Sequence, residues 1–384
     1  MTATLPTLQR PDLSDAALAA VTVEVAATAE EYDRSGAIPV AGIAAAHRAG
    51  LLTATVAERF GGPGVSLLDT VRILVALGEG DPSVALLAAN TLAAHQGQAT
   101  AGHWPQAAYD ELLRRSAEGP ALVNAIRAEP ELGAPARGGL PATTARRTAD
   151  GWSLSGRKAY ATGGAALANH VVWAVTDEPE PRVGHLIVPA DAPGITWVET
   201  WDHLGLRASN THDVIYDEVA LPADAFLEIP RVDGVYRDPA AVTGVASFGH
   251  PALYVGVARA ARAAFVRYAR ERVPTALGRP IAETERIQTV AGEIDAQIAL
   301  AETLLHGALL RTDTAHLPQL PLLKVQIARA AIAAVETAVA ALGNPALTRH
   351  QPFERHLRDV LCVRVHPPQE DAALLAAGRR LFST

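Results

Sequence analysis

The stretch TTARRTADGWSLSGRKAY, residues 143–160, differs from the alanine-rich sequence on either side of it. It contains short β-rich pieces, and the Asp150-Gly151 pair near its centre is typical of a β-hairpin turn. Similar pieces continue to about Pro230, namely HVVWAVT (170–176), VGHLIVPA (183–190), ITWVET (195–200) and THDVIYDEVAL (211–221). Together they predict a small antiparallel β domain over residues 119–232.

Helical patterns occur on both sides of this region. Before it, from Asp12 to about Leu113, apolar residues recur three and four positions apart, with breaks at glycines. Ser66 and Asp81 are placed to cap two of these helices, and Pro82 suits the first turn of the second one. After the β-rich region, helical spacing returns at about Ala240 and continues to the end of the chain.

The order of these patterns predicts an α+β fold with three domains. They are an N-terminal helical domain (1–118), the middle β domain (119–232) and a C-terminal helical bundle (233–384). A chain of 384 residues is too long for one ordinary core, which agrees with this division.

Composition limits the class of protein. Hydrophobic residues make up 49% and charged residues 19%, as in globular proteins. A net charge of -8 is unfavourable for binding nucleic acid or an anionic membrane. The single cysteine, Cys362, excludes an internal disulfide, and the N-terminus lacks the pattern of a signal peptide. We therefore expect a cytoplasmic protein that binds neither nucleic acid nor membrane.

The C-terminal stretch 343–379 concentrates charge, prolines and three histidines. A helix predicted over FERHLRDVLCV must end before Pro367 and Pro368, because neither proline can continue it and the residue before a proline avoids the α region. A second helix is predicted to begin at Glu370. His366 is therefore expected between two helix ends, where it could transfer protons or simply cap a helix.

Three charged residues lie close together on the first of these helices. Arg355 and Arg358 share one face, and Asp359 follows Arg355 at four-residue spacing, close enough to pair with it. The pattern favours a structural ion-pair network, and it leaves Arg358 as a candidate to bind a cofactor phosphate. The sequence contains no CxxC pair, HExxH, Walker loop, GxGxxG after a strand or GxSxG, which excludes many metal, nucleotide and serine enzymes.

Four motifs resemble those of the acyl-CoA dehydrogenase superfamily of flavoproteins. In chain order they are AGLLTATVAERFGGPG (49–64), AEPELG (128–133), SGRKAYATGGAALANHVVWAV (155–175) and WDHLGLRASNTHDVIYDEVALP (201–222). They resemble the family's N-terminal segment, its TEPxxGSD loop, its GxKxxITNGxxAD strand and the segment that closes its β domain. The resemblance implies a helical domain, a β-barrel-like domain and a four-helix bundle, with flavin between the last two and a homotetrameric assembly.

The sequence departs from the dehydrogenases of this family at the catalytic base. In those enzymes a glutamate removes the α-proton of an acyl thioester. Its position corresponds to Pro367 here, Glu370 falls three positions later, and the alternative base position of some relatives falls near Ala246 or Ser247. Because proline supplies neither a base nor an N–H, the usual dehydrogenation is not expected. The family's arginine at the flavin diphosphate corresponds to Pro274, so FMN or a loosely held reduced flavin is as consistent as FAD.

These departures resemble the two-component flavin monooxygenases of the dibenzothiophene monooxygenase type. Those enzymes receive reduced flavin from a separate reductase and transfer an oxygen atom to sulfur, nitrogen or aromatic carbon. Carried over by position, the resemblance implies catalytic roles for His366, His95 and Thr162. Besides Thr162, which would lie near the flavin N5, it implies flavin contacts for Asn124 and Trp201.

Each of these residues also has a structural interpretation. His95 fits a satisfied core histidine, Trp201 ordinary packing in the β domain, and Thr162 a plain strand residue. Three functions therefore stay open. The favoured one is a reduced-flavin monooxygenase acting on a hydrophobic small molecule. The second is a dehydrogenase with an unorthodox base such as Glu370 or a histidine, and the third is a flavin-free helical scaffold.

Overall fold

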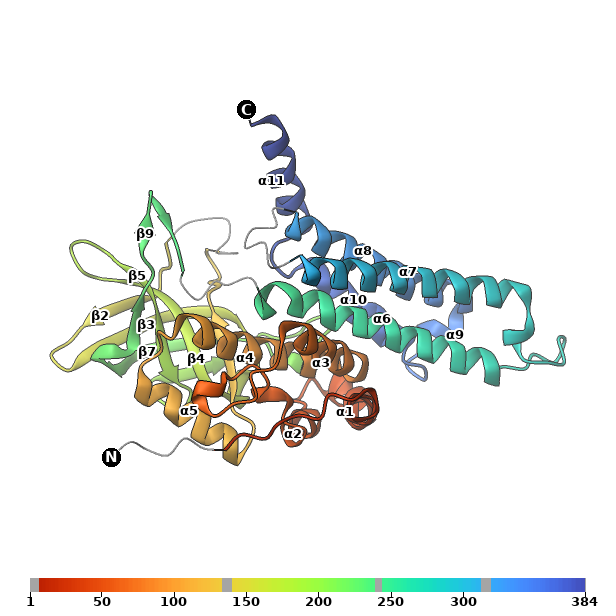
Figure 1. Ribbon diagram of the computed structural model, residues 1–384, viewed down its shortest axis with the longest axis horizontal. Coiled ribbons are helices and arrows are strands. Elements are labelled where there is room, and N and C mark those ends of the chain that lie inside the picture. Colours follow the sequence, from red (N-terminus) through yellow and green to blue (C-terminus); the bar gives the residue numbers. More distant parts are fainter. Residues whose placement is uncertain (1–6, 133–139, 239–243, 312–318, 384) are drawn as a thin grey trace.

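The computed structural model describes residues 7–132, 140–238, 244–311 and 319–383. Gly133, the last residue of the AEPELG motif, lies outside them. The chain forms a group of N-terminal helices, then a sheet, and then an elongated helical bundle on the other side of the molecule (Figure 1). The predicted α+β class is confirmed.

The N-terminal helices surround one central helix. They are α1 (Asp15–Ser35), α2 (Val40–Arg48), α3 (Leu67–Gly80), α4 (Pro82–Ala101) and α5 (Gln106–Glu118), with the short turns η1 (Leu51–Thr53) and η2 (Glu58–Phe60). Both predicted caps are confirmed: Ser66 Oγ accepts the Asp69 N–H at 3.1 Å, and the Asp81 carboxylate accepts the Ser83 N–H at 2.8 Å. Helix α4 is buried around most of its circumference because it packs against α3 and also contacts later parts of the chain.

The middle of the chain forms an eight-stranded sheet. Its strands are β1 (Leu122–Ile126), β2 (Thr144–Arg147), β3 (Gly151–Ala161), β4 (Leu167–Thr176), β5 (Val183–Pro189), β6 (Ile195–Val198), β7 (His212–Pro222) and β8 (Phe226–Glu228). They lie in the order β6-β7-β3-β2-β4-β5-β8, with β1 beside β4. A separate pair consists of β9 (Arg231–Val232) and β10 (Val235–Tyr236), and the turns are η4 (Gly164–Ala166), η5 (Arg207–Ser209) and η6 (Ala223–Ala225).

Most neighbouring strands are antiparallel, as predicted, and the Asp150-Gly151 turn joins the antiparallel pair β2 and β3. Strands β1 and β2 differ, because both run parallel to β4. Neither is connected to β4 by a tight hairpin, so the chain can cross over and pair with it in the same direction.

The last part of the chain is a four-helix bundle with one projecting helix. The bundle consists of α6 (Val245–Glu271), α7 (Glu285–Leu310), α8 (Leu320–Leu342) and α10 (Phe353–Leu361), with η7 (Ile281–Glu283), α9 (Asn344–Leu347) and η8 (Cys362–Arg364) between or after them. Helix α11 (Glu370–Phe382) begins at the predicted residue and projects from the bundle (Figure 1). Helix α8 is long and apolar enough to cross a membrane, but its buried face packs here against α6, α7 and α10.

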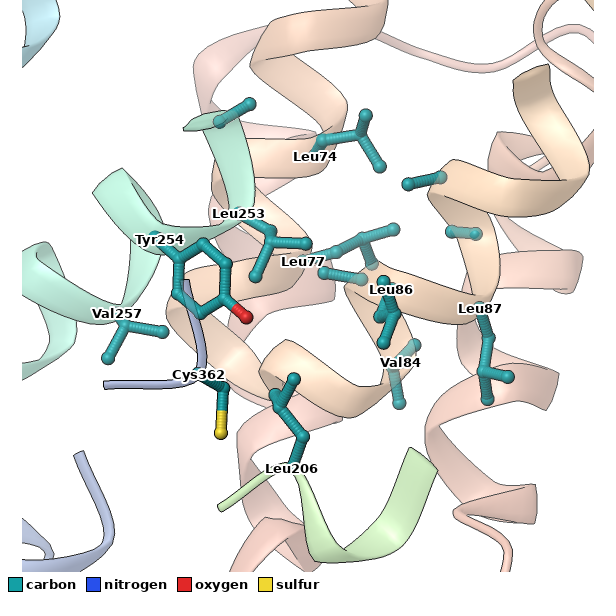
Figure 2. Close-up of a cluster of buried hydrophobic side chains, with 14 of the residues drawn as sticks. Leu74, Leu77, Val84, Leu86, Leu87, Leu206, Leu253, Tyr254, Val257 and Cys362 are labelled. Carbon is teal, nitrogen blue, oxygen red and sulfur yellow. The ribbon is translucent and has the colours of Figure 1, made fainter. Parts of the chain in front are cut away.

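One hydrophobic core joins the N-terminal helices to α6. Figure 2 shows leucines and valines of α3 and α4 meeting Leu253, Tyr254 and Val257 of α6. The α3 and α6 backbones touch: a Cβ atom on Gly78 would lie 2.2 Å from the Leu253 carbonyl oxygen, and one on Gly256 would lie 2.3 Å from that of Val75. Small residues at both points therefore fix the position of the beginning of α6.

Candidate functional site

A cavity of about 730 Å³ lies where the three parts of the chain meet. Its walls come from α4, β1, β3, the segment before β7, the first turns of α6 and the loop between η8 and α11. Small-molecule sites commonly have volumes of roughly 300–1,000 Å³. Four of the residues predicted from the sequence, Asn124, Thr162, Trp201 and His366, line this cavity.

Thr162 lies in a short chain of hydroxyl groups at the end of β3. Its backbone N–H donates to Asn124 Oδ1 at 3.1 Å, and its Oγ1 accepts the Thr211 hydroxyl at 3.2 Å. Ser209 Oγ lies 2.7 Å from Thr211 Oγ1 and continues the chain. A hydroxyl that accepts a hydrogen bond keeps its own hydrogen to donate, so Thr162 can present a donor to a molecule in the cavity.

Asn124 reaches the same place from β1. The N–H of the preceding residue, Val123, donates to Thr91 Oγ1 of α4 at 3.1 Å, and this bond ties β1 to the central helix. The side chain of Asn124 is buried among the strands, with its amide oxygen held by Thr162. Two of the sequence-predicted cofactor contacts are therefore hydrogen-bonded to each other.

Trp201 forms an aromatic plate at the cavity wall. Its ring stacks on His203, with centroids 4.3 Å apart and planes 7° apart. The indole N–H donates to the Leu206 carbonyl at 3.2 Å, and the Trp201 backbone N–H donates to His212 Nδ1 at 3.0 Å. The ring is thus held in one orientation before any ligand binds.

Strand β3 is irregular where it borders the cavity. Its register with β7 shifts between Lys158 and Ala161, and Tyr160 within this bulge has φ 58°, a rare value for a residue with a side chain. Bulges of this kind redirect side chains and are common beside functional sites. Tyr160 lines the cavity although its side chain is largely exposed.

The glutamate of the AEPELG motif, Glu129, has a structural role. Glu129 Oε1 forms a buried ion pair with Lys158 Nζ at 2.8 Å. Its two oxygens also accept the backbone N–H groups of Ala142 and Thr143 at 2.7 and 3.0 Å. Burial lowers the pKa of Lys158 to about 8, with Glu129 opposing that effect. Glu129 does not line the cavity, so this ion pair stabilises β3 from outside the cavity.

His366 lies in the loop before α11 and stacks on His250, which is in the second turn of α6. The ring centroids are 4.2 Å apart and the planes 18° apart. His366 Nε2 is buried and has no hydrogen-bond partner among the described residues. Burial lowers the pKa of His366 well below its usual value and that of His250 to about 4, so both rings are neutral at pH 7.

Lys324 of α8 holds the His366 loop from outside. Its ammonium donates to the His366 carbonyl and, at 2.9 Å, to the Pro368 carbonyl. Burial lowers the pKa of Lys324 to about 8. These two bonds fix the backbone on both sides of Pro367.

His95 lies away from this cavity. Its side chain is fully buried in α4, its Nδ1 is 3.1 Å from the Tyr109 hydroxyl, and the two rings meet edge to face. Burial lowers its pKa to about 4. His95 is not among the residues that line the cavity; it is a buried core histidine of which only Nδ1 is hydrogen-bonded, since Nε2 has no partner among the described residues.

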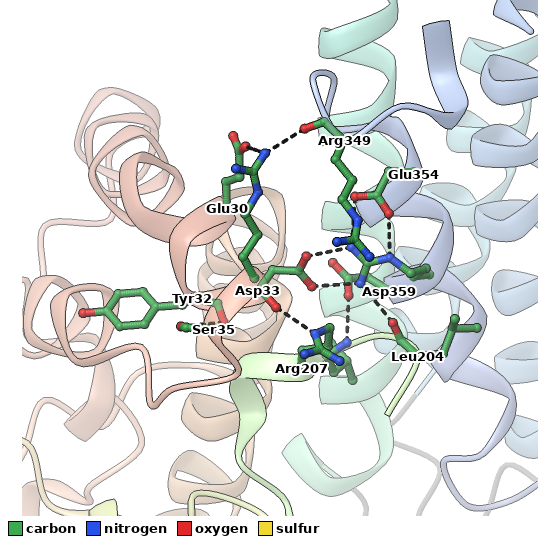
Figure 3. A network of polar contacts seen from close by, with 12 residues as sticks. Glu30, Tyr32, Asp33, Ser35, Leu204, Arg207, Arg349, Glu354 and Asp359 are labelled. Atoms are coloured by element: carbon green, nitrogen blue, oxygen red, sulfur yellow. Dashed lines mark hydrogen bonds and ion pairs between the residues drawn. The ribbon is translucent and has the colours of Figure 1, made fainter. Parts of the chain in front are cut away.

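Arg358 also lies outside the lining, in a network that joins Asp33 of α1 to Glu354 of α10. Figure 3 labels both of these carboxylates. The Arg358 guanidinium donates twice to Asp33, twice to Glu354 and once to the Leu204 carbonyl. Arginine has five N–H donors, so none is left for a phosphate unless this network rearranges. The predicted partner of Asp359 was Arg355, but no ion pair joins these two residues in the described structure; Asp359 accepts the Leu206 N–H instead.

No carboxylate lines the cavity among the described residues. The ionisable side chains there are Arg127, Tyr160, Cys362 and the imidazoles of His203, His250 and His366. Glu370, the acid considered as an unorthodox base, lines a separate groove beside α8 and pairs with Arg329. The chemistry available at the cavity wall is therefore that of imidazole and hydroxyl groups.

Sequence reasoning missed His250 and the stacking role of His203. His250 could have been found because it lies one helical turn after Ala246 and Ser247. The resemblance sets those two residues near the alternative base position of the family. His203 adjoins the predicted Trp201 but gave no signal of its own, because only the folded loop brings the two rings face to face.

Family models of all three domains of acyl-CoA dehydrogenases match this chain in order. The N-terminal domain model matches residues 9–107, the middle domain model residues 125–219 and the C-terminal domain model residues 248–368. YdbM of Bacillus subtilis (strain 168), a provisionally assigned acyl-CoA dehydrogenase, is 29% identical over 363 residues, covering 93% of each chain. L-evernosamine nitrososynthase of a Micromonospora species is 31% identical over 370 residues, covering 89% of this chain and 83% of the relative.

Solved structures agree with these relatives. KijD3 in complex with FMN and dTDP-3-amino-2,3,6-trideoxy-4-keto-3-methyl-D-glucose superposes with a TM-score of 0.80 at 28% identity, over 99% of this chain and 96% of that one. TdsC from Paenibacillus sp. A11-2, solved with FMN and indole, superposes with a TM-score of 0.78 at 22% identity, over 95% and 96% of the two chains, which supports the fold alone. Because the three domain models match in order over most of the chain, the chain belongs to the acyl-CoA dehydrogenase family of flavoenzymes.

Proposed function

We propose that this protein is a reduced-flavin monooxygenase that transfers one oxygen atom of O2 to a hydrophobic small molecule. The observation that carries the proposal is the cavity wall, which presents three imidazoles and a chain of hydroxyls but no carboxylate among the described residues. Removal of an α-proton from an acyl thioester needs a base of suitable strength within reach of that proton. The family's usual carboxylate base is replaced by Pro367.

The residues of the cavity fit a flavin. The stacked Trp201 and His203 rings and the indole of Trp173 offer flat aromatic surfaces to a planar ring system. Thr162 has a free hydroxyl hydrogen to donate, because its oxygen already accepts from Thr211. We propose FMN in preference to FAD, since all five donors of Arg358 are already engaged and the KijD3 relative was solved with FMN.

A bound reduced flavin would supply the two electrons that split O2, so that one oxygen atom goes to the substrate and the other leaves as water. The protein's own contribution is to exclude solvent and to handle protons. Leu86, Trp173 and Leu206 give the cavity apolar walls, which favour oxygen transfer over loss of hydrogen peroxide to water. His366 is neutral, with a buried Nε2 free of protein partners, so it can accept a proton there.

An amine nitrogen is the acceptor atom that we favour within this class. The nitrososynthase relative is named for L-evernosamine, and KijD3 was solved with a dTDP-linked 3-amino sugar. An ammonium group must lose a proton before its lone pair can attack oxygen. A cavity with neutral imidazoles and no lining carboxylate removes that proton without holding the cation in an ion pair. We further propose that the reduced flavin comes from a separate reductase.

The experiment supplies FMN, NADH, a flavin reductase and ¹⁸O2, with indole and the dTDP-linked 3-amino sugar as probe substrates. Mass spectrometry of the products measures incorporated ¹⁸O. Label in either product, dependent on both the reductase and this protein, supports the proposal. The competing dehydrogenase function, which the YdbM relative favours, is tested in the same series by adding butyryl-CoA to the flavin-loaded protein under argon.

Two variants separate these functions. Glu370→Gln should leave oxygen transfer unchanged, because Glu370 pairs with Arg329 outside the cavity. His366→Gln should reduce oxygen transfer by about 10²–10⁴-fold, the usual contribution of a general base. Bleaching of the flavin by butyryl-CoA that is lost in Glu370→Gln would establish a dehydrogenase instead. Flavin binding is measured by quenching of the fluorescence of the cavity tryptophans. If no flavin quenches this fluorescence, the protein is a flavin-free scaffold.

A further inference from the structure

The stacked pair His250 and His366 joins two elements that are distant in the sequence. His250 belongs to α6, His366 to the loop before α11, and both line the cavity. Tyr254, one turn further along α6, lies with its ring 5.7 Å from that of His366. Its hydroxyl is buried and has no hydrogen-bond partner among the described residues. The pair is thus a face-to-face contact of two imidazoles with a buried phenol beside it.

Both halves of the pair are held by backbone contacts. On the α6 side, the Val245 N–H at the start of the helix donates to Gln96 Oε1 at 2.7 Å, and Gly256 lies against the α3 backbone. On the loop side, Lys324 binds the carbonyls that flank Pro367. The 4.2 Å ring separation is therefore imposed by the fold from two directions.

The surroundings of the pair allow it to hold one positive charge at most. The ionisable groups that face the rings are Lys324 from α8 and His203 from the segment before η5. Tyr254 from α6 adds a neutral phenol. No carboxylate among them balances a cation, and two imidazolium ions at this separation would repel each other. A proton on one ring therefore disfavours a proton on the other, so that the two imidazoles bind a single proton as a coupled pair.

We propose that His250 is a second catalytic residue of this site and that His250 and His366 act as one base, which takes a single proton from the substrate. The inference rests on the proposed monooxygenase function and assigns it a proton acceptor. For an amine, one N–H bond of the ammonium group breaks and its proton goes to the pair. The nitrogen lone pair then forms the N–O bond as the O–O bond breaks.

The overall reaction balances. An ammonium substrate, O2 and a two-electron reduced flavin carrying two hydrogens give a hydroxylamine, water, oxidised flavin and one proton released to solvent. The released proton is the one that the pair accepts. Because a proton on one ring disfavours a proton on the other, the pair takes up this one proton and no second.

The first test needs neither flavin nor turnover. Ring-nitrogen NMR of the flavin-free protein follows each histidine from pH 8 down to the lowest pH at which the protein stays folded, in the wild type and in His250→Gln. The pKa of His366 should rise in the variant, because a neighbouring imidazole that lowers it is gone. The exposed His350→Gln is the matched control and should leave the His366 titration unchanged. An unshifted His366 in His250→Gln would overturn the pair.

The second test is a double-mutant cycle on oxygen transfer. Residues that act as a unit give non-additive losses. His250→Gln and His366→Gln should each lower turnover by about 10²-fold or more, and the double variant should lose little beyond either single change. Losses that multiply would mean two independent residues. His250→Phe keeps an aromatic ring for stacking but no nitrogen, so it should fold and still be impaired; full activity in it would also reject the inference.

The two levels of the proposal fail differently. If the wild type transfers no ¹⁸O to any probe, the monooxygenase function fails, whatever the NMR titrations give. If the wild type is active while His250→Gln and His250→Phe retain full turnover, only the catalytic role of His250 is rejected. Flavin affinity and melting temperature, measured for every variant, separate a chemical effect from a folding defect.

Discussion

Asp359 Oδ1 accepts the backbone N–H of Leu206 at 2.7 Å, and this bond fastens the end of α10 to the segment that leads into η5. Gly205, which precedes Leu206, has no room for a side chain, because a Cβ atom there would lie 2.2 Å from the Arg358 carbonyl oxygen. The same segment continues through Ser209 to Thr211, which donates to Thr162. The hydroxyl chain of the cavity is thus positioned by a carboxylate that does not itself line the cavity.

Asp359→Asn tests this bond through the pH dependence of stability. Burial raises the pKa of Asp359 from 3.8 to about 7, with the Leu206 N–H and Arg355 opposing it and Asp33 and Asp81 adding to it. A carboxyl with a raised folded-state pKa stabilises the fold below pH 3.8, and that contribution falls as the pH rises through 7. Asparagine keeps an acceptor for Leu206 without the charge. Above pH 7 its free energy of unfolding should therefore rise relative to that of the wild type, by at most ~4 kcal/mol.

The measurement is the free energy of unfolding by urea at pH 4 and pH 8 for both proteins. Asp359→Ala, which removes the acceptor as well, is the contrasting variant and should destabilise the protein by about 1–3 kcal/mol at pH 4. Equal pH dependence in the wild type and Asp359→Asn would contradict the raised pKa.

Arg358→Lys distinguishes a structural arginine from a phosphate ligand. Lysine keeps the charge but cannot reproduce the paired bonds to Asp33 and Glu354, so the variant should lose about 1.5–3 kcal/mol of stability, the usual contribution of hydrogen bonds to charged groups. FMN affinity, measured by titration at a temperature where the variant is folded, should change little. A large loss of FMN affinity with unchanged stability would restore the phosphate-binding role.

Asp33→Asn is the matched partner for this prediction. It removes the charge at the other end of the same contact, where the two carboxylate oxygens lie 2.9 and 2.6 Å from the guanidinium nitrogens. The two variants should be non-additive in a double-mutant cycle, because each removes the same interaction.

Features that depend on sequence neighbours were predictable. The caps at Ser66 and Asp81, the hairpin at Asp150 and the start of α11 at Glu370 all follow from short-range chemistry, and the structure agrees with each. Strand order was not predictable in this way. The parallel pairing of β1 with β4 depends on a crossover that no local pattern encodes.

The cavity residues were predictable through the resemblance to a known family, which also placed Asn124 and His366 there, outside the quoted motifs. Thr162 and Trp201 could be placed at the cavity because each belongs to a motif that resembles the family's. A structural ion-pair role was favoured for Arg358 from its helix, but its partner Asp33 could not be identified there, because it is 325 positions away in the sequence. His250 was missed for the same reason: its stacking partner lies on another element, and a histidine on an apolar helix is more often structural.

Thr162→Val tests the hydroxyl chain. Valine has nearly the same shape but neither accepts from Thr211 nor donates into the cavity, so stability should fall by about 0.5–1.5 kcal/mol. Oxygen transfer should fall by more than this stability loss explains, about 10-fold or more, if the hydroxyl contacts the flavin. Thr162→Ser restores the hydroxyl and should recover most of the activity. Equal turnover in the valine and serine variants would leave Thr162 as a plain strand residue.

Gly78→Ala tests whether the contact between α3 and α6 positions the cavity wall. Alanine is the better helix former, by about 1 kcal/mol, so a glycine inside a helix usually gains stability from this change. At Gly78 the new methyl group would meet the Leu253 backbone, which cannot move aside as a flexible side chain could. Overpacking should therefore outweigh the helix gain and destabilise the protein by about 1–3 kcal/mol. Gly292→Ala in α7 is the control, because no atom lies within 4 Å of its new Cβ, and it should be neutral or stabilising.

Because α6 carries His250, Gly78→Ala should also disturb the ring-nitrogen NMR signals of His250 and His366, whereas Gly292→Ala should leave them in place. Equal behaviour of the two glycine variants in both measurements would mean that the helix contact does not set the geometry of the pair.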